Sequence, residues 1–357
     1  MSAQPLLAPR EGLDTALHGL VWAFWFDETG RPTHLDDDAV AGRLRSGEGW
    51  VWLHLNLTDN RAQDWIPDLP LDARSSAVLR AADPRLQVRI HDGEISGVVS
   101  DFSLEFDGER SFEMGRLRFA LTERVMVSAR HHPLRTIERI REDFAGGRVV
   151  PDVAHVFELV VDGFLDAAHE DLEASSDEID ELVESVIAGR VSGQFGRTAT
   201  VRRGLLRLRR EIVHLRAALR PLEGSSVQSP SAGRLHKAVA SSAARLVARL
   251  DALYHDVHDL QDRLRLFREE LDSLAAAETN RQLYILSFLT AIFLPGTFIT
   301  SMFGMNTKDL PLGQTDDGFW YAILIVVGAT ALVLGLLVIR LARRDGPLRR
   351  RPSEMPR

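Results

Sequence analysis

The segment FLPGTFITSMFGMN, from Phe293 to Asn306, carries polar side chains within an otherwise apolar stretch of sequence. A helical wheel at about 100° per residue gathers one set of residues on a single face. We call this set the polar stripe, and its members are Asn280, Leu283, Ser287, Thr290, Leu294, Thr297 and Ser301. Hydroxyl groups on such a helix either bond to their own backbone or to another helix, or they line a water-filled path.

Three features near the end of this segment favour the water-filled path. Pro295 has no N–H, so the Ala291 carbonyl lacks its usual helical partner. The C-terminus of a helix carries partial negative charge, which several parallel copies would direct at one cation. Gly304 permits close approach of the backbone, and Asn306 supplies a neutral amide oxygen. A neutral oxygen suits a hydrated divalent cation, because a carboxylate would hold the ion too tightly to release it.

Two uncharged runs, Leu283 to Phe303 and Phe319 to Ile339, predict membrane-spanning helices. Each has about 21 residues, which is enough to cross a hydrocarbon core of roughly 30 Å. Arg281 precedes the first run and an arginine-rich tail follows the second, so both termini are predicted to be cytoplasmic in a multi-pass protein. The alternative is a buried hairpin in a soluble protein, which would rarely run this far without a charge.

The composition excludes several classes of function. The chain has 357 residues, a net charge of -8 and no cysteine, which rules out disulfides and thiolate metal sites. No secretory signal is visible. We find no phosphate-binding glycine loop, nucleophile elbow or zinc-protease motif. We therefore expect no catalytic residues, no enzymatic activity, no cofactor and no nucleic-acid partner.

The order of patterns along the chain predicts an α+β protein. Runs such as LVWAFWF and WVWLHLNL predict strands of a largely antiparallel, meandering sheet with helices between them. The predicted parts are a disordered N-terminus (1–17), a cytoplasmic α/β domain (18–150), an acidic/basic helical hairpin (151–233), a stalk helix (234–282), a first transmembrane helix (283–305), an outer loop (306–318), a second transmembrane helix (319–341) and a basic cytoplasmic tail (342–357).

The helical part shows two further patterns. An acidic helix over 152–188 and a basic helix over 197–220 predict an antiparallel hairpin with complementary charge. That hairpin is either a solvated structural element or a surface that attracts cations. From Arg234 to about Met305 the pattern predicts one continuous helix of about 105 Å. Its leucine stripe cannot be buried by one helix alone, which predicts self-association.

A second candidate metal site lies in the predicted stalk, in the sequence DALYHDVHDLQD. His255 and His258 are spaced i,i+3, with Asp251 and Asp259 within one turn. These side chains could hold a regulatory zinc ion or change protonation near neutral pH. The alternative is a solvated, charged helix surface.

LPGTFITSMFGMN resembles the end of the first membrane helix in the CorA superfamily of divalent metal-ion transporters, whose signature is Gly-Met-Asn. The resemblance extends to the stalk helix, the two C-terminal helices, the basic tail and the acidic-basic hairpin. Phe303 stands where magnesium-type members usually have tyrosine. Together with WVWLHLNL, ADPR and VMVSARHHPL, it makes the chain more similar to the ZntB-like zinc transport branch.

The resemblance implies a homopentameric funnel in the bacterial inner membrane, with five first transmembrane helices around a pore. Asn306, Gly304 and Met305 would form the outer selectivity ring, and the polar stripe would line the conduit below it. Leu283 and Leu294 would act as hydrophobic constrictions.

The transported divalent cation would be zinc, with magnesium, cobalt and nickel also candidates. One alternative is a CorA-type magnesium or cobalt channel gated by cytoplasmic metal. A second alternative is a membrane-tethered coiled-coil scaffold or sensor, which would need the stalk but not the polar stripe.

Overall fold

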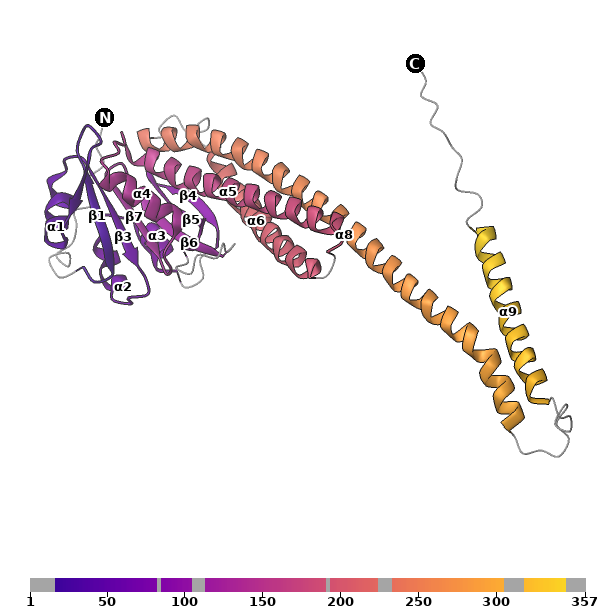
Figure 1. Ribbon diagram of the computed structural model, residues 1–357. Coiled ribbons are helices and arrows are strands. Elements are labelled where there is room, and N and C mark those ends of the chain that lie inside the picture. Colours follow the sequence, from indigo (N-terminus) through magenta and orange to yellow (C-terminus); the bar gives the residue numbers. More distant parts are fainter. Residues whose placement is uncertain are drawn as a thin grey trace, which may run out of the picture. The chain divides into compact units, whose positions relative to one another are not determined.

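The structure is a computed structural model. It describes residues 17–81, 85–104, 113–190, 193–223, 233–304 and 318–344. The chain divides into two compact units, Met1–Arg268 and Glu269–Arg357. The first unit contains a mixed α/β domain followed by long helices, and the second contains two long helices (Figure 1).

The α/β domain is built on a seven-stranded sheet with strand order β2-β1-β3-β7-β6-β5-β4. The strands are β1 (Leu20–Phe26), β2 (Pro32–Leu35), β3 (Trp50–Asn56), β4 (Gln87–His91), β5 (Glu94–Phe102), β6 (Met114–Leu121) and β7 (Val125–Arg130). Neighbouring strands are antiparallel except β3 and β7, which run parallel in the centre of the sheet. The predicted sheet is therefore largely right, but β2 and the parallel pair were not predicted.

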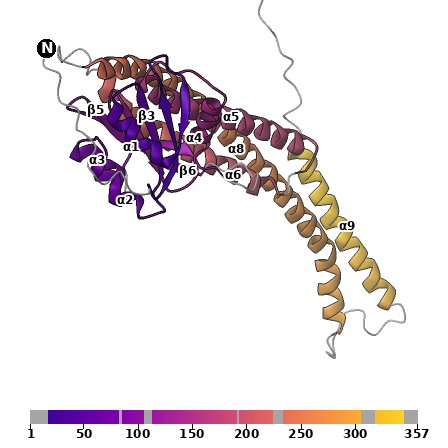
Figure 2. The same cartoon turned by 90° about the vertical axis from the view of Figure 1, so that its left-hand side faces the viewer.

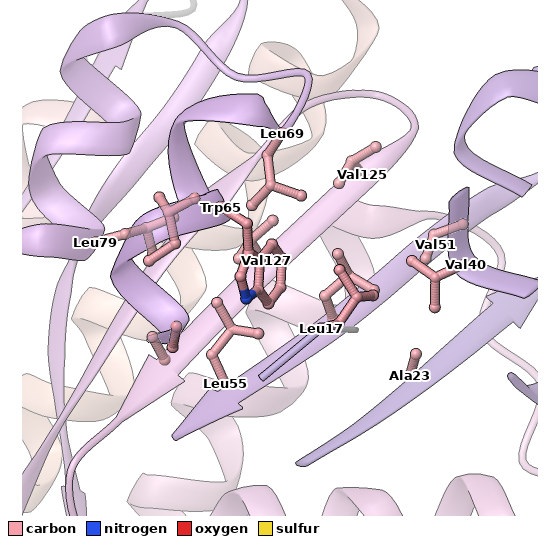
Figure 3. Packing of buried hydrophobic residues seen from close by; sticks show 14 of the residues in the cluster. Leu17, Ala23, Val40, Val51, Leu55, Trp65, Leu69, Leu79, Val125 and Val127 are labelled. Atoms are coloured by element: carbon pink, nitrogen blue, oxygen red, sulfur yellow. The ribbon is translucent and has the colours of Figure 1, made fainter. Parts of the chain in front are cut away.

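One face of the sheet packs against three short helices, α1 (Asp37–Ser46), α2 (Ala62–Trp65) and α3 (Ala73–Arg80), and a 3-10 turn, η2 (Ile66–Asp68), lies between α2 and α3. Alternate residues of the two central strands supply this core, because successive side chains of a strand point to opposite faces. They are Val51, Leu53, Leu55, Val125, Val127 and Ala129. Trp65 of α2, Leu79 of α3 and Leu69, which follows η2, pack with them (Figure 3).

The opposite face is aromatic. Trp22 is stacked on His54, and Phe26 is stacked on Trp50 with ring centroids 3.7 Å apart. Phe144 of α4 (Arg135–Ala145) makes edge contacts with Phe26. Phe119 packs on Phe157 and Phe102 packs on Phe164, which attaches the next helix to the sheet.

Three long helices follow: α5 (Val153–Ile187), α6 (Gln194–Glu223) and α8 (Arg234–Gly304). Figures 1 and 2 show α5, α6 and the first half of α8 running side by side. The leucine stripe of α8 is buried within this single chain, over Leu246, Leu250, Leu253, Val257, Leu260, Leu264 and Phe267. The prediction that this stripe requires self-association was therefore wrong, because α5 and α6 already cover it.

The acidic side chains of α5 pair mainly with α8 rather than with α6. Arg245 contacts Glu158, Arg249 contacts Asp162 and Asp166, and Arg263 contacts Asp180. Each pair joins residues 87 or 83 positions apart, so α5 and α8 run parallel and in register.

In the described residues, the ion pairs between α5 and α6 come from Arg197, which contacts Glu178 and Glu181. The predicted antiparallel hairpin is present, and the predicted charge pairing within it occurs at Arg197, although more of the acidic side chains of α5 pair with α8. The acidic helix α5 thus has α8 as a second basic neighbour, and the sequence predicted this part of α8 only as a stalk.

A buried polar contact fixes α6 to the sheet. Both terminal nitrogens of Arg116 donate to the Glu211 carboxylate, at 2.7 and 3.1 Å, and the Ser100 hydroxyl donates to the same group at 2.5 Å. Burial would raise the pKa of Glu211, but the hydrogen bonds from Arg116 and Ser100 outweigh it and hold the pKa below its ordinary value. Glu211 therefore remains charged within the fold.

The second unit contains the remainder of α8 and the helix α9 (Gly318–Arg344). Both helices are long and apolar enough to cross a membrane. Neither apolar segment is buried within the chain. The predicted long helix and C-terminal helix are thus present at the expected positions.

Candidate functional site

The polar stripe lies on one open face of α8. All seven of its side chains are exposed, and Leu283 and Leu294 expose 55% and 65% of their surface. The half-buried residues of this part of α8 gather on the opposite side, namely Phe288, Ala291, Ile292, Pro295, Gly296 and Ile299. From Phe288 onward, the polar stripe therefore lies within the side of α8 that this chain leaves uncovered, whereas residues 280–287 are exposed on every side.

The helix α9 covers the other side of α8. A β-carbon added at Gly296 would lie 3.4 Å from Val326 Cγ1 of α9. Gly296 is nine positions from Ser287, which places the two residues about 180° apart on the helix. A hollow between the two helices is lined by Ile292, Thr300 and Thr330 among others, and also by Thr297 and Ser301 of the stripe. The α9 contact thus points away from the centre of the stripe.

A shallow groove of about 570 Å³ runs along the stripe itself. It is lined by Leu289, Thr290, Phe293, Leu294, Thr297, Phe298 and Ser301. The groove mixes hydroxyl groups with large apolar side chains and is open on one side. The hydroxyl groups of the groove could contact water or a hydrated ion, and the remaining side chains of the groove are apolar.

The threonine hydroxyls of the site are fixed by their own helix. Thr290 donates to the Leu286 carbonyl at 2.9 Å, and Thr297 donates to the Phe293 carbonyl at 2.8 Å. Each hydroxyl oxygen keeps lone pairs free to accept. Because the hydroxyl proton is donated to the backbone, the hydroxyl oxygen faces outward as a hydrogen-bond acceptor. Water molecules bound to a cation point their hydrogens away from it, so they can donate to this oxygen. A threonine of the stripe can therefore donate to its own backbone and also line a water-filled path.

The features predicted at the end of α8 are only partly within the described residues. Pro295 and Ala291 lie on the half-buried flank rather than at the centre of the stripe. Gly304 is the last residue of α8, and a β-carbon added there would meet no described atom within 4 Å. Met305 and Asn306 lie outside the described residues, so the expected selectivity ring stays a prediction.

The candidate metal site in the stalk is not assembled within one chain. His255, His258 and Asp259 are exposed on α8. The Asp251 carboxylate lies 2.6 Å from Arg216 Nε, although without hydrogen-bond alignment. Among the described residues, no group of three or more histidine, aspartate or glutamate side chains is arranged to hold a metal ion.

The contact of Gly296 with α9 was not predicted from the sequence. Gly296 is one of several small residues in an apolar run. Nothing in that run shows whether a given glycine allows another helix to pack closely or only makes the helix more flexible. Its position opposite the hydroxyls was readable from the helical wheel. Its partner Val326 was not, because α9 is apolar on every side.

The model of the CorA-like Mg2+ transporter protein family matches residues 47–344 of the chain. The chain belongs to the CorA family. This CorA chain is also similar to proteins named zinc transport protein ZntB. That of Yersinia enterocolitica is 27% identical over 322 residues, covering 88% of this chain and 93% of the relative. That of Klebsiella pneumoniae is 24% identical and covers 90% and 96%.

Solved structures support the same fold for this CorA chain. The full-length CmaX protein has a TM-score of 0.73 and 21% identity, and the match covers 91% of this chain and 98% of CmaX. The CorA magnesium transporter of Methanocaldococcus jannaschii has a TM-score of 0.64 and 17% identity, with the same coverage. The chain is thus a divalent-metal transporter of a membrane family and not an enzyme, as predicted.

Proposed function

We propose that this CorA chain forms a homopentamer in the inner membrane, with both termini cytoplasmic, and conducts a divalent cation through a central pore. Five copies of α8 would surround the pore, and α9 would lie outside them against lipid. The observation that carries the proposal is the exposed polar stripe of α8 on the side opposite Gly296 and Val326.

A polar stripe on a membrane-spanning helix can lie in only a few environments. Polar groups at membrane depth are tolerated where they are covered by protein or line a water-filled cavity. In this chain α9 covers the opposite flank, and the stripe is exposed. Packing the apolar flanks of several α8 helices together would turn every stripe toward one axis and close the groove into a conduit.

Two leucines interrupt the stripe. Leu283 and Leu294 are eleven positions apart, or about 16 Å along the helix. Rings of leucine would narrow and dewet the conduit at two levels, and hydrophobic constrictions of this kind serve as gates. Above them, Gly304, Met305 and Asn306 would form the outer ring that meets the hydrated ion.

We favour zinc as the transported ion. The relatives at 24–27% identity are named as zinc transport proteins, whereas the matching family is described by magnesium transport. The alternative of a tethered scaffold or sensor is not favoured, because such a protein has no use for an exposed hydroxyl stripe. Magnesium, cobalt and nickel remain the ions to compare.

The test is ion flux into proteoliposomes that contain the purified full-length protein. Asn306→Ala should abolish zinc uptake, while native mass spectrometry still shows a pentamer. Thr300→Ala is the matched control, because it removes a hydroxyl from the same helix off the stripe. Unchanged uptake in Asn306→Ala would contradict the proposed ring, and magnesium uptake without zinc uptake would contradict the proposed ion.

A further inference from the structure

A cavity of about 570 Å³ lies in the first unit, between α4 and the edge of the sheet formed by β1 and β2. All of its lining residues belong to that unit, so a single chain builds the whole cavity. Its volume falls within the range of about 300–1,000 Å³ that is usual for small-molecule sites. We call it the α4 cavity, and it is lined by Val21, Trp22, Phe24, Pro32, His34, Glu138, Arg141, Phe144 and Ala145.

Aromatic side chains form much of the wall of the α4 cavity. Trp22 and Phe24 meet edge to face with ring centroids 5.5 Å apart, and Phe144 of α4 contacts Phe24 at 5.9 Å. His34 is exposed, and its ring stands at 86° to that of Phe24. Because these rings support one another, the wall is formed before any ligand arrives. A wall of this kind suits a ligand with a flat, apolar body.

The α4 side of the cavity carries charge, and its negative group is already paired. Arg141 Nε donates to Glu138 Oε2 at 2.8 Å, and Glu138 Oε1 lies 3.8 Å from Arg130 Nη2. One carboxylate therefore faces two guanidinium groups, which leaves one positive charge in excess. Among the described residues, neither terminal nitrogen of Arg141 donates a hydrogen bond, and the Glu142 carboxylate lies 4.0 Å from Nη2. The positive edge of Arg141 is thus available to a ligand.

Buried contacts hold Glu138 and Arg130 in this arrangement. Arg130 is 8% exposed, and its Nε donates to His54 Nε2 at 3.2 Å. Burial and the nearby Arg130 charge lower the pKa of His54 well below its ordinary value, so the ring is neutral. Its Nδ1 then carries the proton and donates to Ser128 Oγ at 2.8 Å. The pairing of Glu138 is therefore tied to the centre of the sheet.

The same arrangement disfavours a metal ion in the α4 cavity. His34 and Glu138 are two potential ligands, whereas a zinc site in a protein uses at least three. A cation would also have to compete with Arg130 and Arg141 for the Glu138 carboxylate. The transported ion is thus a poor occupant, and an anion is a better one.

We propose that the α4 cavity binds a small aromatic carboxylate. Its ring would lie against the aromatic wall, and its carboxylate would accept hydrogen bonds from the two terminal nitrogens of Arg141. Such paired bonds between a guanidinium group and a carboxylate are strong and directional. The proposal does not depend on the proposed transport, because the cavity shares no residue with the polar stripe.

Isothermal titration calorimetry of the purified full-length protein with 1-naphthoate tests this site. The probe should bind, and Arg141→Gln should weaken the binding about tenfold, because hydrogen bonds to a charged group are lost. Arg139→Gln is the matched control and should change nothing, since Arg139 lies on the same helix outside the cavity and pairs with Glu170. Detergent takes up the probe equally in both samples, so a difference between the variants originates at the cavity.

A second variant tests the charge preference without altering α4. Val21 is 41% exposed, so Val21→Glu adds a negative charge to the lining at an exposed position. It should also weaken 1-naphthoate binding about tenfold while the melting temperature is unchanged. The cation 1-naphthylmethylammonium has a similar shape and should bind at least tenfold more weakly than 1-naphthoate to the unaltered protein.

Three results would each overturn the proposal: no binding of 1-naphthoate at about 1 mM, equal affinities in Arg141→Gln and Arg139→Gln, or equal binding of the cationic probe. Zinc binding that is lost in His34→Ala would assign the cavity to a metal and would also overturn it. None of these measurements involves ion flux, so each outcome leaves the proposed function standing. Unchanged uptake in Asn306→Ala, in turn, leaves the α4 cavity proposal unaffected.

Discussion

Gly296 of α8 lies against Val326 of α9, so close that an added β-carbon would stand 3.4 Å from Val326 Cγ1. This contact lies on the side of α8 that α9 covers. Ser287 lies about 180° away around the helix, and the stripe that contains it is exposed. The account of transport depends on that orientation.

Enlarging residue 296 should separate the two helices. Gly296→Leu forces a side chain into Val326 and should cost about 1–3 kcal/mol, as overpacking does. We expect a lower melting temperature in detergent, measured by tryptophan fluorescence. Gly335→Leu is the control, because a β-carbon there meets no described atom within 4 Å. Equal melting temperatures for the two variants would show that the contact is not tight.

The buried contact of α6 with the sheet should matter more than the surface contacts of α8. Glu211→Ala leaves Arg116 and Ser100 without their acceptor in a largely buried place. We expect a loss of about 3 kcal/mol in the free energy of unfolding. Arg249→Ala removes exposed pairs with Asp162 and Asp166 and should cost about 1 kcal/mol or less.

Urea unfolding of a fragment ending at Arg268 measures both variants. A loss at Arg249 equal to that at Glu211 would contradict this ranking. It would show that the parallel pairing of α5 and α8, rather than the anchor on the sheet, holds the helices in place.

Much of the fold could be predicted because it depends on local patterns. Alternation predicts strands such as Trp50–Asn56, and period-3.6 spacing predicts the long helices. The four-residue strand β2, with the polar sequence PTHL, carries too little pattern to be seen. The parallel pairing of β3 with β7 joins segments about 75 positions apart, and no local signal specifies it.

The tertiary errors have one cause. The pattern shows that α8 has a leucine stripe and that α5 has an acidic face, but it does not show which helix covers which. The constant offset from Glu158 to Arg245 and from Asp162 to Arg249 was present in the sequence. One acidic helix and two helices with basic side chains allow more than one pairing, and the prediction took the basic helix nearer in sequence. For the site, the stripe was predictable, whereas its relation to Val326 was not.

The fold should carry a pH dependence that originates at Asp101. This carboxylate is fully buried and accepts from the backbone N–H groups of Phe102 and Thr136 at 2.8 and 3.1 Å. Burial raises its pKa to about 6 from an ordinary 3.8. Since the folded state then binds the proton more tightly than the unfolded state, ionisation of Asp101 destabilises the fold as the pH rises from about 4 to 6.

Comparison with Asp101→Asn isolates this effect from the other carboxylates. The unfolding free energy of the wild type minus that of the variant should fall between pH 4 and pH 7, by roughly 3 kcal/mol in total. Above about pH 7 the difference should be constant. A difference that stays flat across the range, or that rises with pH, would contradict a raised pKa at Asp101.

The most direct measurement of the central claim is the water accessibility of α8 in the assembled protein. Single cysteines are introduced into this cysteine-free chain at Ser287, Thr290 and Thr297 on the stripe, and at Ile292 and Ile299 on the opposite flank. The proteoliposomes are treated with a charged, membrane-impermeant thiol reagent. The account predicts labelling of the three stripe positions, with loss of ion flux, and protection of the two isoleucine positions. Protected stripe positions, or equal labelling of both sides, would contradict it.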